Sequence, residues 1–249
     1  MARFLVTGSA DGLGRATAEA LLDAGHRVVV HARNASRGRT LAPLIARGAE
    51  LVVADFAQRD EVLALADALN DAPALDGIVH NAGVISGTDL IPVNVVAPYL
   101  LTALVRSPER HVYLSSGMHR GGRPALDGID WSGTRQTASY SDSKLFVTAL
   151  STAVARIDPG RFSNAVDPGW VPTRMGGAGA PDSFDLGHLT QEELVAGTGW
   201  AANVSGGYWY HGQRQTPHPA ATDEAFQDAL LDALAQDTGV RLRAAGASK

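Results

Sequence analysis

The fold of this chain is decided by the stretch Phe4-Leu5-Val6-Thr7-Gly8-Ser9-Ala10-Asp11-Gly12-Leu13-Gly14. A short apolar run leads directly into three glycines spaced Gly-x3-Gly-x-Gly, and a helical pattern begins at Gly14. Glycine lets the backbone turn sharply and approach a ligand, and a helix N-terminus supplies N–H donors and a partial positive charge. The stretch therefore predicts a strand, turn and helix around a pyrophosphate, although three glycines alone are a weak signal.

The same alternation of short apolar runs and amphipathic segments continues along the chain. Strands are predicted at 4–6, 28–30, 51–53, 77–79, 111–114 and 163–166, and helices at 14–24, 36–47, 58–69, 92–105, 139–156 and 222–236. Continuous apolar strands indicate a parallel sheet covered by helices on both faces. We predict one α/β domain over 1–249 with a doubly wound, three-layer Rossmann-type sheet. A substrate-side loop is expected at about 169–199, with a short helix at 191–196.

Composition excludes several classes of protein. The 249 residues contain 21 Lys and Arg against 26 Asp and Glu, a net charge of −5, with 45% hydrophobic residues and no cysteine. No basic run favours nucleic acid, no apolar stretch approaches the roughly 20 residues of a membrane span, and the histidines lack metal-site spacing. We expect a cytoplasmic protein that binds neither metal, membrane nor nucleic acid.

The end of the second predicted strand bears on the choice of cofactor. Arg33 and Asn34 fall where a dinucleotide fold places the adenosine ribose, and an arginine there accommodates the 2′-phosphate of NADP. A solvated turn arginine is the alternative. Asp11 in the glycine loop weakens the preference slightly, because its negative charge would repel the phosphate. NADP(H) is the expected cofactor, with NAD(H) as the alternative.

Tyr140 and Lys144 lie four residues apart on a predicted helix, which places both side chains on one face. An ammonium about 4 Å away contributes about 4 kcal/mol at an effective dielectric constant near 20, which would lower the pKa of the phenol from about 10. Such a tyrosine exchanges protons near neutral pH. A lone Tyr-x3-Lys is usually a surface pair, but Ser116 at a strand end and Asn94 in a helix add to the pattern.

Taken together, these motifs resemble the short-chain dehydrogenase/reductase family, in the branch that contains retinol dehydrogenases and carbonyl reductases. The resemblance covers nearly the whole chain, and its motifs occur in the family's order. They are Thr7-Gly8-x3-Gly12-x-Gly14, Asp55, Asn81-Ala82-Gly83, Asn94, Ser116, Tyr140-x3-Lys144 and Pro168-Gly169-x-Val171-x-Thr173. The Ser115-Ser116-x-x-His119 pattern supports that branch.

The resemblance implies a catalytic tetrad of Asn94, Ser116, Tyr140 and Lys144, with Ser115 as the substitute for Ser116. It implies that Asp55 contacts the adenine and that Thr173 holds the nicotinamide carboxamide. In that reading Lys144 also binds the nicotinamide ribose and relays protons through a water positioned by Asn94. The implied cofactor-binding set is Gly8, Ser9, Asp11, Gly12, Leu13, Gly14, Arg33, Asn34, Asp55, Phe56, Asn81, Ala82, Gly83, Tyr140, Lys144, Pro168, Gly169, Val171 and Thr173.

The sequence is less informative about the substrate and the assembly. An apolar carbonyl or alcohol is suggested by residues of the two segments expected to wall the pocket, namely Met118, His119, Trp131, Trp170, Met175, Phe184 and Leu189. Trp131 and Phe184 can equally anchor their loops, and His119 fits a hydrogen-bonded loop residue better than a proton carrier. The intervals around Asn94 are shorter than that branch shows, so a homo-oligomer is left open.

Two alternatives to a reductase are weighed. A regulatory protein that senses NADP(H) without turnover would typically lack the tyrosine or the lysine, and both are present. An isomerase or dehydratase of the extended branch would usually show a different glycine spacing and a larger C-terminal region.

Overall fold

A single eight-stranded sheet organises the chain in the computed structural model, which describes residues 1–242. The strand order is β3-β2-β1-β4-β5-β6-β7-β8, and every neighbouring pair is parallel except β7 with β8. The strands are β1 (Arg3–Val6), β2 (Arg27–Ala32), β3 (Glu50–Val53), β4 (Gly77–His80), β5 (Arg110–Leu114), β6 (Phe162–Asp167), β7 (Tyr208–Tyr210) and β8 (Gln213–Gln215). The order reverses between β1 and β4, the switch point at which such sheets bind ligands.

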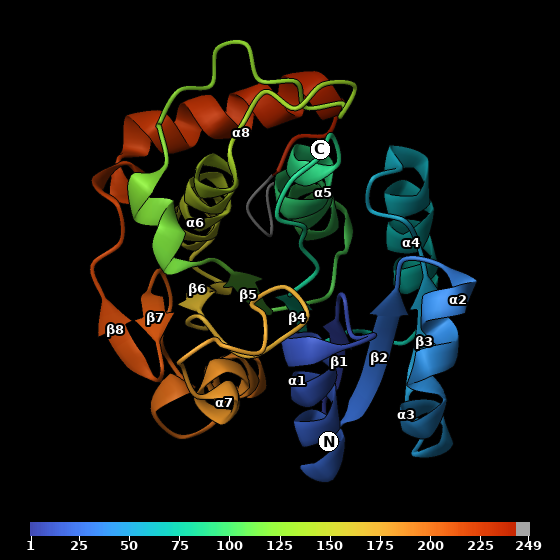
Figure 1. Cartoon of the computed structure of the whole chain (residues 1–249). Coiled ribbons are helices and arrows are strands. Elements are labelled where there is room, and N and C mark those ends of the chain that lie inside the picture. Colours follow the sequence, from blue (N-terminus) through green and yellow to red (C-terminus); the bar gives the residue numbers. More distant parts are fainter. Residues whose placement is uncertain (243–249) are drawn as a thin grey trace.

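Helices cover both faces of the sheet, as predicted (Figure 1). One face carries α1 and α7, and the other carries α4, α5 and α6, with α8 packed on the outside of α6. The helices are α1 (Gly12–Asp23), α2 (Ala35–Gly38), α3 (Ala42–Ala46), α4 (Arg59–Asp71), α5 (Ala97–Leu104), α6 (Tyr140–Ile157), α7 (Phe184–Ala196) and α8 (Glu224–Thr238). The doubly wound three-layer fold is therefore confirmed.

Strands β1, β2, β4, β5 and β6 follow the predicted apolar runs because both of their faces are buried between helices, whereas the edge strand β3 leaves Leu51 and Val53 exposed. Phe4, Leu5 and Val6 of β1, for example, are each at most 1% exposed, and their side chains divide between two cores, one on each face. Alternate residues of a strand point to opposite faces, so a strand covered on both sides reads as a continuous apolar run.

Four predicted elements differ from the structure. The helix expected at 36–47 is broken into α2, a 3₁₀ turn and α3, which starts afresh around Pro43 because proline cannot donate a helical hydrogen bond. Residues 92–96 form a π-helix instead of the first turns of an α-helix. The helix expected at 222–236 begins after Asp223, whose carboxylate caps α8.

The fourth difference lies in the segment predicted as a substrate loop. The helix there, α7, is longer than the predicted 191–196, and it is capped by Ser183 and ended by Gly197 in the left-handed conformation. No strand was predicted at β7 or β8, which form a hairpin at the end of the sheet. No described helix is long and apolar enough to cross a bilayer.

Candidate active site

The glycine loop connects β1 to α1 and is held against the end of β4. Gly8 has a φ of +67°, and a Cβ there would lie 2.8 Å from the Cα of Ala82. At Gly14 a Cβ would lie 2.2 Å from Nδ2 of Asn81, whose amide donates to the carbonyls of Thr7 at 2.9 Å and Gly8 at 3.2 Å. Only glycine fits these two positions, and the loop presents bare backbone at the N-terminus of α1.

His31 holds the loop from the other side, and the sequence analysis missed it. Its Nδ1 accepts the N–H of Gly8 at 2.9 Å, and its Nε2 lies 2.8 Å from the carbonyl of Ala54, so the ring is neutral with its proton on Nε2. The ring also stacks on Phe56, with centroids 4.2 Å apart. Burial lowers the pKa of His31 to about 4. A buried strand histidine contacting a loop far away in sequence leaves no local signal.

Charged side chains gather at the end of β2. Arg33 is exposed, lines the cleft and has no ion-pair partner among the residues that the structure describes. Arg37, which the sequence analysis did not select, also lines the cleft and forms an ion pair with Asp11. The Asp11 charge is therefore compensated, and the objection that it would repel a phosphate is weakened. Asp55 and Phe56 complete this end of the cleft.

Three residues of the expected cofactor set do not line the cleft. Ser9 is fully buried, and its hydroxyl accepts the N–H of His31 at 3.0 Å. Asn34 caps α2 by accepting the N–H of Arg37 at 2.9 Å. Gly14 serves the site by making room for Asn81. In the structure these three residues support the loop and the helices around the cleft rather than line it.

Asn94 lies in the π-helix and binds the segment that follows Asn81-Ala82-Gly83. Its Oδ1 accepts the N–H of Val84 and its Nδ2 donates to the carbonyl of Val84, both at 2.9 Å. Nδ2 also donates to the hydroxyl of Ser143 at 3.0 Å, on α6. Asn94 is 2% exposed, and both N–H groups of its amide donate to partners within the protein. π-Helices are frequent at functional sites, and here this one brings the amide against the cleft wall.

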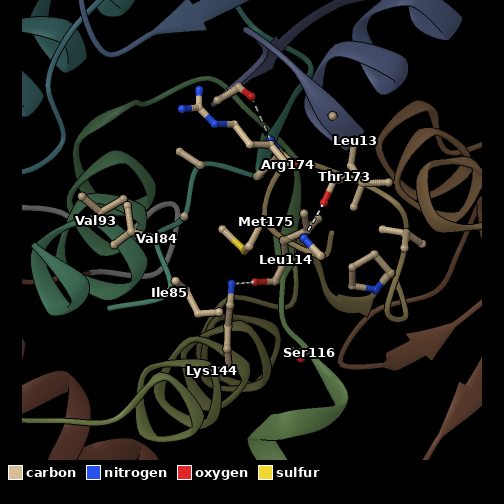
Figure 2. Close-up of a pocket in the computed structure, with 18 of the residues that line it drawn as sticks. Leu13, Val84, Ile85, Val93, Leu114, Ser116, Lys144, Thr173, Arg174 and Met175 are labelled. Carbon is tan, nitrogen blue, oxygen red and sulfur yellow. Dashed lines mark hydrogen bonds between the residues drawn. The ribbon is translucent and has the colours of Figure 1, made fainter. Parts of the chain in front are cut away.

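Tyr140 and Lys144 come from the first turns of α6, where Ser139 and Asp142 form a capping box. The Nζ of Lys144 donates to the carbonyl of Leu114 at 2.7 Å (Figure 2) and lies 5.5 Å from the centroid of the Tyr140 ring. Ser116 lies near enough to Tyr140 to act on the pKa of its phenol. Ser116, Tyr140 and Lys144 all line the same cleft, so the structure brings these three predicted residues together.

The geometry distinguishes between the two serines at the end of β5. The hydroxyl of Ser115 is paired with that of Thr148 at 2.6 Å, and the residue is 2% exposed. Ser116 is half-buried, and its hydroxyl caps the following 3₁₀ helix by accepting the N–H of Met118 at 3.2 Å. Ser116 is therefore the serine placed to meet a ligand beside Tyr140.

The electrostatics of the pair differ from the sequence-based expectation. Burial raises the pKa of Tyr140 to about 12, against the opposing effect of the nearby Ser116 hydroxyl. Burial also lowers the pKa of Lys144 to about 8. The expectation that Lys144 would draw the phenol toward neutral pH is wrong for the protein without ligands. The ammonium is directed at a backbone carbonyl, and burial disfavours the charged form of both groups.

Asp167 adds a buried carboxylate at the end of β6 that the sequence analysis missed. It accepts the hydroxyl of Tyr208 at 2.9 Å and the N–H of Gly169 at 3.0 Å, and it is 7% exposed. Its negative charge raises the pKa of both Tyr140 and Lys144. Asp167 precedes the Pro168-Gly169 motif directly, which was the signal available in the sequence.

The cleft has a volume of about 970 Å³, and its substrate side is largely apolar. Met118 and Trp170 line it as predicted. Met175 was also predicted there, and Figure 2 shows it in the wall with Val84, Ile85 and Val93. Pro168, Gly169, Val171 and Thr173 also line the cleft. The exposed side chains of Ile85, Met118 and Trp170 give the opening an apolar rim.

Four residues expected in the pocket wall are elsewhere. Trp131 packs against Phe146 and lines a second, smaller cavity, which confirms its alternative role as a loop anchor. Phe184 and Leu189 lie on α7 outside the cleft. His119 is fully buried and hydrogen-bonded, as the favoured interpretation of this residue predicted.

Comparison with known proteins identifies the family. The model of the short chain dehydrogenase family matches residues 2–106. A short-chain dehydrogenase of Penicillium rubens is 34% identical over 259 residues, covering 98% of this chain and 100% of that protein. The chain belongs to the short-chain dehydrogenase family. The chain is also 29% identical to retinol dehydrogenase 14 of Homo sapiens, over 69% of its own length and 62% of that protein.

A solved structure agrees with the fold. An uncharacterized Mycobacterium paratuberculosis protein superposes with a TM-score of 0.82 at 22% identity, covering 97% of this chain and 95% of its own. The resemblance stated from the motifs is thus confirmed, and the protein is an oxidoreductase of this family.

Proposed function

We propose that this short-chain dehydrogenase transfers a hydride between NADP(H) and an apolar carbonyl or alcohol, with Tyr140 as general acid and base. The observation that carries the proposal is that Ser116, Tyr140 and Lys144 line one cleft whose other end is the glycine loop. A proton donor and a second hydroxyl side by side are what a carbonyl oxygen needs as it gains negative charge.

In the direction of reduction, Tyr140 donates its phenolic proton to the substrate oxygen. Ser116 donates a hydrogen bond to that oxygen, and this bond strengthens as charge develops in the transition state. The Lys144 ammonium favours the phenolate that remains on Tyr140. The bound nicotinamide supplies the hydride. Asn94 holds the Val84 backbone at the cleft wall, which is a positioning role.

The residues present fit a dinucleotide with a 2′-phosphate. The bare backbone of the glycine loop suits a pyrophosphate, and Asp55 and Phe56 lie where the adenosine would bind. In this proposal Lys144 also binds the nicotinamide ribose, and Thr173 binds the carboxamide, as the resemblance to the family implies. Arg33 supports NADP(H) over NAD(H) because, within residues 1–242, it is a cation at the end of β2 without an ion-pair partner, and the Arg37–Asp11 pair adds no net charge.

The apolar lining of the substrate side supports a carbonyl compound with an apolar body. Trp170, Met175 and Met118 offer area and polarisable contact with few hydrogen-bonding groups. The cytoplasmic location expected from the sequence stays a prediction.

The test follows NADPH or NADH oxidation at 340 nm with aldehydes, ketones and quinones. We expect turnover with lower KM for NADPH, and Tyr140→Phe should reduce kcat by about 10²–10⁴-fold with NADPH binding nearly unchanged. The two serines provide a matched pair: Ser116→Ala should reduce kcat strongly and Ser115→Ala only weakly. Tight NADPH binding without turnover on any substrate would contradict the proposal and favour a sensor.

A further inference from the structure

His119 lies three residues after Ser116, in the 3₁₀ helix Gly117–Gly121, and is fully buried. Its Nδ1 is 2.8 Å from the carbonyl oxygen of Ser116, and its Nε2 is 2.9 Å from the backbone nitrogen of His218. The ring therefore joins the residue proposed to contact the substrate to a segment about a hundred residues further along the chain.

The two partners fix the proton on the ring. The carbonyl of Ser116 can only accept, so Nδ1 must donate. The backbone N–H of His218 can only donate, so Nε2 must accept. His119 is thus neutral with its proton on Nδ1, the reverse of the arrangement in His31. A protonated His119 would direct an N–H at the N–H of His218 and lose that bond.

The surroundings of His119 hold it in place. Its ring packs against Tyr208, with centroids 4.5 Å apart, and Tyr208 in turn donates to Asp167. Arg120, the next residue, donates to the carbonyl of Thr216 at 3.0 Å. The charged or titratable groups that act on the ring are Arg120, Asp167 and His218, and burial lowers the pKa of His119. The segment after β5 is thus fixed to residues 216–218, which lead into α8.

We propose that His119 is a positioning residue that holds the backbone of Ser116 so that its hydroxyl meets Tyr140 and the substrate oxygen. The inference rests on the proposed function, because it assumes that Ser116 contacts the substrate. His119 does not exchange protons with the substrate: both ring nitrogens are occupied by backbone groups, and the side chain is fully buried.

Two substitutions separate the bonds that His119 makes. Asn places an N–H donor near the Nδ1 position, so His119→Asn keeps the bond to Ser116 and loses the one to His218. Gln places its amide near the Nε2 position, so His119→Gln keeps a partner for His218 and loses the bond to Ser116. We expect kcat to fall about tenfold in His119→Gln, with NADPH affinity unchanged, and His119→Asn to recover most of it.

Two further measurements keep a structural role apart from a positioning role. Thermal unfolding of both variants shows whether either has lost the fold, and only variants with cooperative unfolding are compared. The ¹⁵N NMR spectrum of wild-type His119 should show a protonated Nδ1 and an unprotonated Nε2, independently of any activity.

The outcomes are distinguishable. If the wild type is active and His119→Gln has the same kcat, the inference is overturned and the proposed function stands. A proton on Nε2 of wild-type His119 has the same consequence. A folded wild type without turnover on any carbonyl overturns the proposed function and this inference with it. Loss of kcat in His119→Gln that His119→Asn restores supports the inference.

Discussion

At the scale of single residues, the protonation of the buried Lys144 amine sets the pH range in which the site carries a positive charge beside Tyr140. Its pKa of about 8 lies close to neutral pH, whereas the Tyr140 phenol, with a pKa of about 12, stays protonated through the physiological range. Tyr140 can therefore donate its proton throughout that range. The positive charge that favours the resulting phenolate is what changes with pH.

The first prediction is that the rate of reduction falls on the alkaline side of its pH profile. In the direction of reduction, kcat/KM should be level near neutral pH and fall as pH rises through about 8, because Lys144 then loses its proton. Steady-state rates with NADPH between pH 6 and pH 10 measure it. Lys144→Arg should move the limb to higher pH, since arginine stays charged. A limb at the same pH in an active Lys144→Arg enzyme would assign it to another group.

The second prediction concerns His31 and stability. The pKa of His31 is depressed from 6.5 to about 4, so the unfolded chain binds a proton that the folded chain does not between these values. Its contribution to the free energy of unfolding is therefore complete above pH 6.5 and is lost as pH falls toward 4. Between pH 7 and pH 5 the loss is about 2 kcal/mol.

Urea unfolding at pH 7 and pH 5 measures this change. His31→Asn removes the titration and keeps an acceptor for the N–H of Gly8, so the difference between the two pH values should shrink by about 2 kcal/mol. An unchanged difference would show that other buried histidines account for the acid sensitivity.

At the scale of elements, α1 depends on the missing side chain of Gly14. Gly14→Ala forces a Cβ against Asn81, so either the helix or Asn81 must move. We expect a loss of about 1–3 kcal/mol in the free energy of unfolding and weaker NADPH binding. Gly179→Ala is the matched control, because nothing lies within 4 Å of its Cβ position. Equal NADPH affinity in the two variants would show that the close packing of Gly14 on Asn81 does not shape the cofactor-binding loop.

Elements with a strong local pattern could be predicted from the sequence, and those that depend on distant contacts could not. Strands β1 to β5 contain short apolar runs that the pattern exposes directly, and β6 has only Ala165 and Val166 next to Ser163 and Asn164. The three-residue β7 forms by pairing with β6 and β8, and so short a run is no signal by itself. α7 contains Gly187, which is unfavourable in a helix but leaves room for the carbonyl of Pro168, 2.9 Å from its Cβ position.

The same distinction applies to the site. Ser116, Tyr140 and Lys144 belong to spaced motifs, and their shared cleft follows from the fold. His31 of β2 contacts the glycine loop that follows the neighbouring strand β1, 23 residues earlier in the sequence. His119 contacts His218, which lies 99 residues later. Neither partner can be inferred from spacing. The pKa values of Tyr140 and Lys144 depend on burial, which the distance between two residues on a helix does not reveal.

At the scale of the whole molecule, α8 and residues 239–242 cover α6 and part of α5. Every α6 residue from Asp142 to Val154 is buried within the chain. Gln227 of α8 donates to Thr152 of α6 at 3.1 Å, and the hydroxyl of Tyr99 on α5 donates to the carbonyl of Val240 at 2.6 Å. These two helices leave little apolar surface for a second copy.

The fourth prediction follows from this covering. We expect a monomer of about 26 kDa, measured by size-exclusion chromatography with light scattering at several protein concentrations. Twice that mass, independent of concentration, would show that another surface forms a dimer.

The hairpin of β7 and β8 bears on how the protein loses activity and aggregates on heating. One edge of β7 pairs with β6 and the other is shielded by β8, whose Gln213 and Arg214 are exposed and polar. If β8 detached, it would uncover unpaired backbone that can recruit another chain. The same event would loosen Tyr208, the partner of Asp167 and His119. Inactivation and aggregation should therefore begin together on heating.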